Sequence, residues 1–431
     1  MTPTPAQATA REEIPVVVIG GGQAGLSISW HLRRRGVEHV VLERDTVAHE
    51  WRDSRWDNFT LVTPNWQCAL PGYAYAGDDP DGFMTRDQVY KWVVEYARTF
   101  DAPVREHVSV TGVTQSEDGG FDVATSAGAI HTEQVVVAVG GYHIPVIPRY
   151  AERIPDRIAQ IHSSQYRGAD RLPAGAVMVI GSGQSGAQIA EDLMLSGRSV
   201  HLATGSAPRV ARFYRGRDCV AWLHDMGVYD VSIDDHPGGL SKREKTNHYV
   251  TGRDGGHDID LRAFALGGMH LYGRVTGLVG TTLTFAPNLE KNLDAADAVS
   301  EGIKDSIDAY IAQEGIDAPT EPRYTPLWRP ETEVTELDTA DVSAIVWSVG
   351  FRTDYRFLKV GVFDGEGMPT HTRGVTATPG VYFLGLPWQH TWGSGRFAAV
   401  ARDAAHLAEQ MNITEPTAPG SVVRRAAARV H

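Results

Sequence analysis

The sequence predicts an α/β protein with two Rossmann-like dinucleotide-binding domains, one inserted in the other. Three observations lead to this prediction. The spacing GxGxxG occurs in "VVVIGGGQAGLS", which starts at Val16, and again in "VMVIGSGQSGAQ", which starts at Val177. Each copy follows a short β-branched run and precedes a helical pattern, as in a dinucleotide-binding βαβ unit. The length of 431 residues leaves room for two or three domains.

The first βαβ unit contains the strand "VVVIG", the helix "GLSISWHLRRRG" and the strand "HVVLERD", which ends in Glu43. Glycines let the backbone approach a pyrophosphate at the helix N-terminus, and an acid about 20 residues further on accepts hydrogen bonds from a ribose diol. We therefore expect this unit to bind a dinucleotide; the alternative is a tight turn that binds nothing. The expected contacts are Gly20, Gly22, Gln23, Ala24, Gly25, Glu43 and Arg44.

The second unit has the same order, but its second strand, "SVHLA", is followed by Thr204 and carries no acid at its end. Arg209 and Arg212 come shortly afterwards. Loss of the acid and gain of arginines accommodate a 2′-phosphate, so this unit is expected to bind NADPH in preference to NADH. Alternatively, the arginines coat a surface loop. The expected contacts are Gly181, Gly183, Gln184, Ser185, Gly186, Thr204 and Arg209.

Composition excludes several other classes of protein. The net charge of −13 argues against nucleic acid or an anionic membrane as the main partner, and no apolar run reaches the length of a membrane span. The N-terminus lacks the apolar core of a signal peptide, and the two cysteines, Cys68 and Cys219, form no CxxC pair, so a cytoplasmic location is expected. The histidines show no metal-ligand spacing, and no metal is expected.

Two nucleotide sites in one chain suggest a flavoprotein, with FAD in the first unit and NADPH as the hydride donor in the second. Nearly all of the chain between its tails resembles the class B flavoprotein monooxygenases. These include flavin-containing, N-hydroxylating, Baeyer–Villiger and plant indole-pyruvate enzymes, and a branch encoded near nitrilase-type genes. The stretches that carry the resemblance are "HEWRDSRWDNFTLVTPNWQCALPG", "VREHVSVTGV", "QVVVAVGGYHIPVIP", "IHSSQY", "AIVWSVGFRTD" and "GVYFLGLPWQHTWGSGRFAAVARDAAHLAEQ".

The resemblance implies further contacts with FAD. It places Trp51, Arg52 and Trp56 along the flavin and the backbone near Val108 at the adenine. The strand that leads out of the flavin domain contains Gly140, and the closing strand passes the cofactor at Gly385.

Asn65 is the one catalytic candidate. Flavin-containing monooxygenases place an asparagine near the flavin C4a atom and the nicotinamide, whereas the plant relatives have lysine at what looks like this position. The alternative is that Asn65 satisfies local backbone groups in a turn after Pro64. "IHSSQY" matches the end of the family motif FxGxxxHxxxY with His162 and Tyr166, but the motif's Phe and Gly are replaced.

In the resembled family, NADPH-reduced FAD reacts with O2 to give a C4a-(hydro)peroxyflavin, which inserts one oxygen atom into a small organic substrate. An NADPH-dependent flavin oxidase or electron-transfer reductase would share every cofactor motif. A disulfide reductase would need a dithiol near the flavin, which the two separate cysteines do not supply.

We expect residues 11–148 and 335–412 to form the FAD-binding domain and residues 149–334 the NADPH-binding domain, between tails at 1–10 and 413–431. An insertion at about 206–270 is expected to act as a substrate lid, a contact of a possible homodimer, or plain packing. "VTGLVGTTLTFAP" predicts a hairpin, and the apolar stripe in residues 288–315 predicts a helix.

Overall fold

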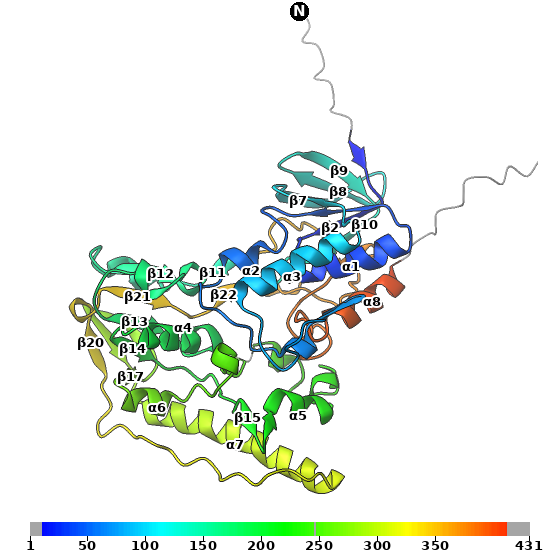
Figure 1. Ribbon diagram of the computed structural model, residues 1–431. Coiled ribbons are helices and arrows are strands. Elements are labelled where there is room, and N and C mark those ends of the chain that lie inside the picture. The colour runs from blue at the N-terminus through cyan, green and yellow to red at the C-terminus, as the bar shows by residue number, and fades with distance from the viewer. Residues whose placement is uncertain (1–10, 245–246, 412–431) are drawn as a thin grey trace, which may run out of the picture.

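The computed structural model describes residues 11–244 and 247–411, so both predicted tails, 1–10 and 413–431, lie outside the described residues. The chain forms two lobes, each built on a five-stranded parallel sheet (Figure 1). The first sheet has the strand order β23-β10-β2-β3-β6. Its strands are β2 (Val16–Ile19), β3 (His39–Leu42), β6 (Val104–Arg105), β10 (Gln134–Val137) and β23 (Val381–Phe383).

Alternate side chains of β2 enter two different cores. Val16 and Val18 pack with the helices α1 (Gln23–Arg34), α3 (Arg86–Thr99) and α8 (Val400–Gln410). Val17 and Ile19 pack toward a second, four-stranded sheet on the opposite face. That sheet is formed by β1 (Glu12–Glu13), β9 (Gly128–Thr132), β8 (Phe121–Thr125) and β7 (Val110–Gln115). Because β2 is buried on both faces, its sequence is an unbroken apolar run.

The second lobe repeats this plan. Its parallel sheet has the order β12-β21-β13-β14-β17. The strands are β12 (Ala159–His162), β21 (Ala344–Trp347), β13 (Val177–Ile180), β14 (Val200–Ala203) and β17 (His270–Tyr272), with α4 (Gln184–Leu195) after β13. A three-stranded antiparallel sheet packs on one face, formed by β18 (Val275–Val279), β19 (Thr282–Phe285) and β20 (Glu336–Asp338). The predicted class of two dinucleotide-binding domains in one α/β chain is confirmed.

One predicted boundary is wrong. Residue 335 was expected to begin the return to the first domain, but β20 pairs with β19, and β21 lies between β12 and β13 in the second sheet. The four residues of β21 are buried on both faces, which fits a central strand of either sheet, so the local pattern could not decide between them. The chain crosses back through β22 (Phe351–Arg352), which pairs with β11 (Ile144–Pro145) between the lobes (Figure 1).

The segment after β14 contains β15 (Phe213–Tyr214), β16 (Arg217–Asp218), α5 (Cys219–Asp225) and α6 (Leu261–Leu266), and it rejoins the sheet at β17. Its α5 packs against α7 (Leu289–Glu314), the helix predicted by the apolar stripe.

The predicted hairpin is present as β18 and β19. The remaining elements are α2 (His49–Asp53), β4 (Ala69–Leu70) and β5 (Tyr73–Ala74). Within the described ranges, no helix combines the length and apolar character that a membrane span requires.

A buried carboxylate on α4 connects the first lobe with two segments of the second. Asp192, on α4, is 1% exposed and accepts three hydrogen bonds from other parts of the chain. Tyr166 Oη donates to Oδ2 at 2.7 Å, and Asn58 Nδ2 of the first lobe donates to Oδ1 at 3.0 Å. Arg253, in the segment after β14, donates to Oδ1 at 2.8 Å. Burial raises the pKa of Tyr166, which therefore donates as a neutral phenol. We call these four residues the Asp192 clamp.

Replacing Asp192 tests how much the Asp192 clamp stabilises the fold. Asp192→Ala leaves the three donors without their acceptor, and it should lower the free energy of unfolding by roughly 3 kcal/mol, the low end for breaking a buried ion pair. Arg253 remains 22% exposed, which limits the loss. Glu95→Ala removes an exposed ion pair on α3 and should cost less than about 0.5 kcal/mol. Equal denaturant midpoints for the two variants would contradict this role of Asp192.

Candidate functional site

The first glycine turn is closed by direct backbone contact. Gly20 has φ +110°, a conformation that favours glycine. A Cβ on Gly25 would lie 1.9 Å from the carbonyl oxygen of Gly20, so the turn and the first turn of α1 touch without space for a side chain. A Cβ on Gly22, in contrast, would meet nothing within 4 Å. The space in front of α1 is therefore open at Gly22, where the sequence predicts a pyrophosphate.

The N-terminus of α1 suits an anion. Gly22 supplies no capping side chain, and the first turn of the helix contains no acidic residue. Free N–H groups and the positive end of the helix dipole then face the open space. Ala24 lies against Gly385, where an added Cβ would come within 2.8 Å of the Ala24 side chain. The closing strand thus passes close to the turn, and a contact of Gly385 with the cofactor stays a prediction.

Glu43 lies beside this turn at the end of β3. Its carboxylate accepts the N–H of Gly21 at 2.7 Å and that of Asp45 at 2.9 Å. The N–H of Val108 donates to the carbonyl oxygen of Glu43 at 2.8 Å, which brings the predicted adenine strand to the same place. Arg44 is exposed and paired with carboxylates, Asp45 among them. The glycine turn, the N-terminus of α1 and the carboxylate of Glu43 together fit a bound dinucleotide.

Trp51 connects the first turn to the C-terminal segment. Its Nε1 donates to Gln23 Oε1 at 3.1 Å, and Gln23 Nε2 donates to the carbonyl oxygen of Gly395 at 3.2 Å. The Trp51 ring stacks on Phe397 with a centroid distance of 5.3 Å. These contacts bring three predicted flavin segments together at the start of α1.

The other residues expected along the flavin have structural contacts of their own. Arg52 donates to Tyr90 Oη at 3.2 Å. Trp56 is buried against Tyr166 and Phe59. Gly140, with φ +70°, follows β10 in an open position where an added Cβ would meet nothing within 4 Å. Their contacts with a flavin stay predictions.

The second glycine turn has the same construction. Gly181 has φ +104°, and a Cβ on Gly186 would lie 1.8 Å from the Gly181 carbonyl oxygen. Gly183 precedes α4 without a capping side chain or an acid in the first turn. Gln184 Nε2 donates to the carbonyl oxygen of Val250 at 2.6 Å, while Ser185 is exposed. The chain therefore presents two helix N-termini that can each receive an anion.

Two residues expected at the 2′-phosphate have internal partners. Thr204 is buried, and its hydroxyl donates to the Tyr272 carbonyl oxygen at 2.8 Å. Arg209 is 3% exposed; its Nε lies 2.6 Å from a carboxylate oxygen of Asp297, and its guanidinium lies over the Tyr324 ring. A phosphate contact by either side chain stays a prediction that these contacts do not favour.

Asn65 is also engaged locally. Its Nδ2 donates to the Asp79 carbonyl oxygen at 2.8 Å, and its Oδ1 accepts the N–H of Met84 at 2.9 Å. The side chain is 3% exposed. These contacts correspond to the alternative in which Asn65 satisfies nearby backbone groups, and they fix the loop at 79–84.

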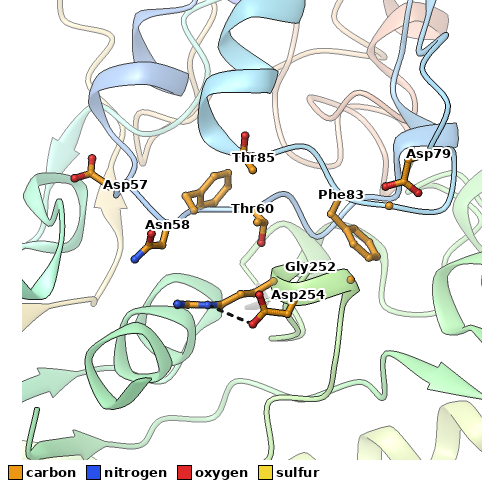
Figure 2. A pocket seen from close by; sticks show the side chains of 12 residues that line it. Asp57, Asn58, Thr60, Asp79, Phe83, Thr85, Gly252 and Asp254 are labelled. Atoms are coloured by element: carbon orange, nitrogen blue, oxygen red, sulfur yellow. Dashed lines mark ion pairs between the residues drawn. The ribbon is translucent and has the colours of Figure 1, made fainter. Parts of the chain in front are cut away.

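That loop lines a cavity of about 400 Å³ (Figure 2). Phe83, Thr60 and Asn58 come from the first lobe, and Gly252 and Asp254 come from the segment after β14. The lining contains no histidine or cysteine. Because Asn58 and the neighbouring Arg253 both donate to Asp192, we interpret the cavity as part of the seam between the lobes.

Thiol chemistry has no support in this arrangement. Cys68 and Cys219 are both free and buried. Burial raises the pKa of each thiol to about 12, so almost no thiolate exists near neutral pH. Residues 11–244 and 247–411 also contain no cluster of His, Cys, Asp and Glu that could hold a metal ion.

Comparison with known proteins agrees with this geometry. Residues 17–223 match the family described as pyridine nucleotide-disulphide oxidoreductase. An uncharacterized CzcO-like oxidoreductase from Geobacillus kaustophilus is 30% identical over 397 residues, which cover 91% of this chain and 97% of that protein. The indole-3-pyruvate monooxygenase YUCCA6 of Arabidopsis thaliana is 29% identical over 45% of this chain and 48% of its own.

The chain belongs to the family of CzcO-like oxidoreductases, and it is similar to the class B flavoprotein monooxygenases. A solved structure with the same fold is the flavin-containing monooxygenase from Stenotrophomonas maltophilia, with a TM-score of 0.63 and 21% identity over 93% of this chain and 98% of that one. Membership makes the protein an oxidoreductase that uses a flavin and a nicotinamide cofactor. The two glycine turns are the places that fit these two groups.

Sequence reasoning missed the residues that join the lobes. Asp192 lies inside the predicted helix and gives no local signal that distinguishes it from a surface acid.

Gly22 and Gly25 should respond differently to alanine. Gly25→Ala places a Cβ 1.9 Å from the Gly20 carbonyl oxygen, so it should disturb the turn itself and lower both flavin retention and stability. Gly22→Ala meets no protein atom within 4 Å and should leave stability unchanged, while its methyl group enters the space for the pyrophosphate and weakens flavin retention.

The ratio of flavin to protein absorbance, measured beside thermal unfolding of the flavin-free protein, separates the two effects. Full flavin occupancy in Gly22→Ala would show that the flavin does not use this turn.

Proposed function

We propose that the protein is an FAD-dependent, NADPH-using monooxygenase that inserts one oxygen atom of O2 into a small organic substrate. In the overall reaction NADPH supplies two electrons and, with a proton from solvent, one oxygen atom leaves as water. The other oxygen atom is transferred to the substrate. NADP⁺, water and the oxygenated substrate are the products.

The observation that carries this proposal is the pair of matching glycine turns in lobes that share the Asp192 clamp. One open helix N-terminus can hold the FAD pyrophosphate at Gly22, and the other can hold the pyrophosphate of NADPH at Gly183. The bound flavin supplies the oxidising chemistry, so the chain does not need its own acid–base pair for that step. The similarity to class B monooxygenases favours oxygen insertion, and the two separate buried cysteines disfavour a disulfide reductase.

The protein's own residues bind, orient and exclude water. Glu43, fixed by the N–H groups of Gly21 and Asp45, is positioned to accept hydrogen bonds from the adenosine ribose of FAD. Trp51 and Phe397 cover the start of α1 with stacked rings. Gln184, held by Val250, fixes the segment after β14 over the second turn. Exclusion of water would keep the reactive form of the bound flavin from decaying before it meets the substrate.

NADPH is proposed over NADH because the strand before Thr204 ends without an acid that would repel a 2′-phosphate. The buried pair of Arg209 and Asp297 is not required for this choice. Arg274 is an exposed cation that follows Tyr272, the residue whose backbone carbonyl holds Thr204, and it is available near the same strand ends.

Turnover with ¹⁸O₂ tests the proposed function. NADPH and ¹⁸O₂ are supplied with a panel of amines, ketones, sulfides and indolic acids, and the products are analysed by mass. One labelled atom should appear in a product, with one NADPH consumed for each product formed, and NADPH should be used more efficiently than NADH. Consumption of NADPH with hydrogen peroxide as the sole product across the panel would instead establish a flavin oxidase.

A further inference from the structure

The middle of the segment after β14 reaches across to the first lobe. Residues 228–238 meet the C-terminal segment of the chain there. The N–H of Ile233 donates to the carbonyl oxygen of His390 at 2.7 Å, and Ser232 pairs with Thr391 in an isolated antiparallel bridge. Part of the second lobe therefore lies directly on the first.

The side chains in this contact are few. The Tyr229 ring stacks on Trp392 with a centroid distance of 4.5 Å, and Asp230 forms an ion pair with Arg402 in which both side chains are exposed. Tyr229 and Ile233 are buried, whereas the rest of this segment is at least partly exposed. Two buried side chains and an exposed ion pair are a weak attachment.

The C-terminal segment under these contacts is firmly held. Ser394 is 1% exposed, and its hydroxyl accepts the N–H of His390 at 3.1 Å. The carbonyl oxygen of Gly395 accepts a hydrogen bond from Gln23, at the start of α1, at 3.2 Å. We call residues 388–397 the floor. The floor is thus fixed beside the first glycine turn, where FAD is proposed.

Both flanks of the crossing segment are attached by buried charges. On the N-terminal side, Arg212 is 1% exposed, pairs with Asp218 and donates to the carbonyl oxygen of Val62 in the first lobe at 2.8 Å. On the C-terminal side, Arg253 donates to the buried Asp192 at 2.8 Å. Because buried ion pairs are costly to break, the middle of the segment separates more easily than its flanks.

The crossing segment is built to move as one unit. The Ser232 hydroxyl donates to Asp235 Oδ2 at 2.7 Å, and the N–H of Gly239 donates to the carbonyl oxygen of His236 at 2.8 Å. Gly227 and Gly239 bound the segment with φ of +70° and +46°, and a Cβ on either would meet nothing within 4 Å. The backbone can therefore turn at both ends while the loop keeps its shape.

We propose that residues 228–238 are a lid, hinged at Gly227 and Gly239, which opens from the floor as a unit and admits the substrate to the flavin. Three roles were expected for this insertion: a substrate lid, a dimer contact or plain packing. Firm flanks around a weakly attached middle favour the lid. In the closed position Tyr229 and Ile233 cover the floor and keep water from it. The inference rests on the proposed function for the molecule admitted.

Hydrogen exchange at single amides of the flavin-loaded protein tests the opening. The N–H of Ile233 bonds to the floor, whereas that of Cys219 bonds to Arg212 in the firm flank at 2.8 Å. Ile233 should exchange about a hundredfold faster than Cys219, because opening the lid leaves the flank in place. Equal protection of the two amides would overturn the inference, since the segment would then be plain packing.

A reversible cross-link tests whether the opening admits substrate. Ser232→Cys with Thr391→Cys joins two partners of an antiparallel bridge, whose spacing suits a disulfide. The oxidised variant should keep its flavin and its rate of flavin reduction by NADPH. It should form product about tenfold or more slowly with any compound that the parent oxygenates, and a reductant should restore the rate.

Ala124→Cys with Ala129→Cys is the matched control. These two residues are exposed and paired across β8 and β9, away from the floor, so their disulfide should change no rate. Unchanged product formation in the locked lid would overturn the inference. Loss of flavin reduction by NADPH in the locked lid would also overturn it, because the segment would then control access of the nicotinamide.

The proposed function fails by a different result. If the parent forms no labelled product from any compound, oxygen insertion is contradicted, and exchange at Ile233 still decides whether the lid opens. If labelled product forms equally fast with the lid locked and unlocked, oxygen insertion stands and the lid does not.

Discussion

Asp192 is a buried carboxylate that helps to fix the second dinucleotide unit against the first lobe. Its charge is costly to bury and is tolerated because Tyr166, Asn58 and Arg253 donate to it from three separate segments. Each donor fixes another part of the molecule against α4, the helix whose N-terminus forms the second turn. The position of α4 relative to the first lobe therefore depends in part on contacts made near the C-terminal end of this helix.

The repeated turn also explains how one backbone design serves two roles. In both units the first and third glycines touch through backbone atoms, and the helix begins without a capping side chain. The units differ where the second strand ends. Glu43 supplies a carboxylate to the first turn, whereas Thr204 is buried under Tyr272 in the second. The shared geometry suits an anion at each turn, and in the proposed function the strand ends distinguish the two nucleotides.

The sequence was informative where structure depends on near neighbours. The turn around Gly20, the position of Glu43, the hairpin at β18 and the helix α7 all follow from patterns within about 25 residues. Sequence could not place β21, because a strand buried on both faces fits either sheet. It also missed that Arg209 pairs with Asp297, 88 residues away. This contact forms only when distant segments meet.

The central claim is that a flavin at the first turn receives hydride directly from a nicotinamide at the second. The most direct measurement is anaerobic stopped-flow reduction of the bound flavin by NADPH deuterated at nicotinamide C4. The account predicts that the flavin is bleached in a single NADPH-dependent phase and that deuteration slows this phase by a primary isotope effect. A flavin that stays oxidised, or whose reduction is insensitive to deuteration although the chemical step limits its rate, would contradict the account.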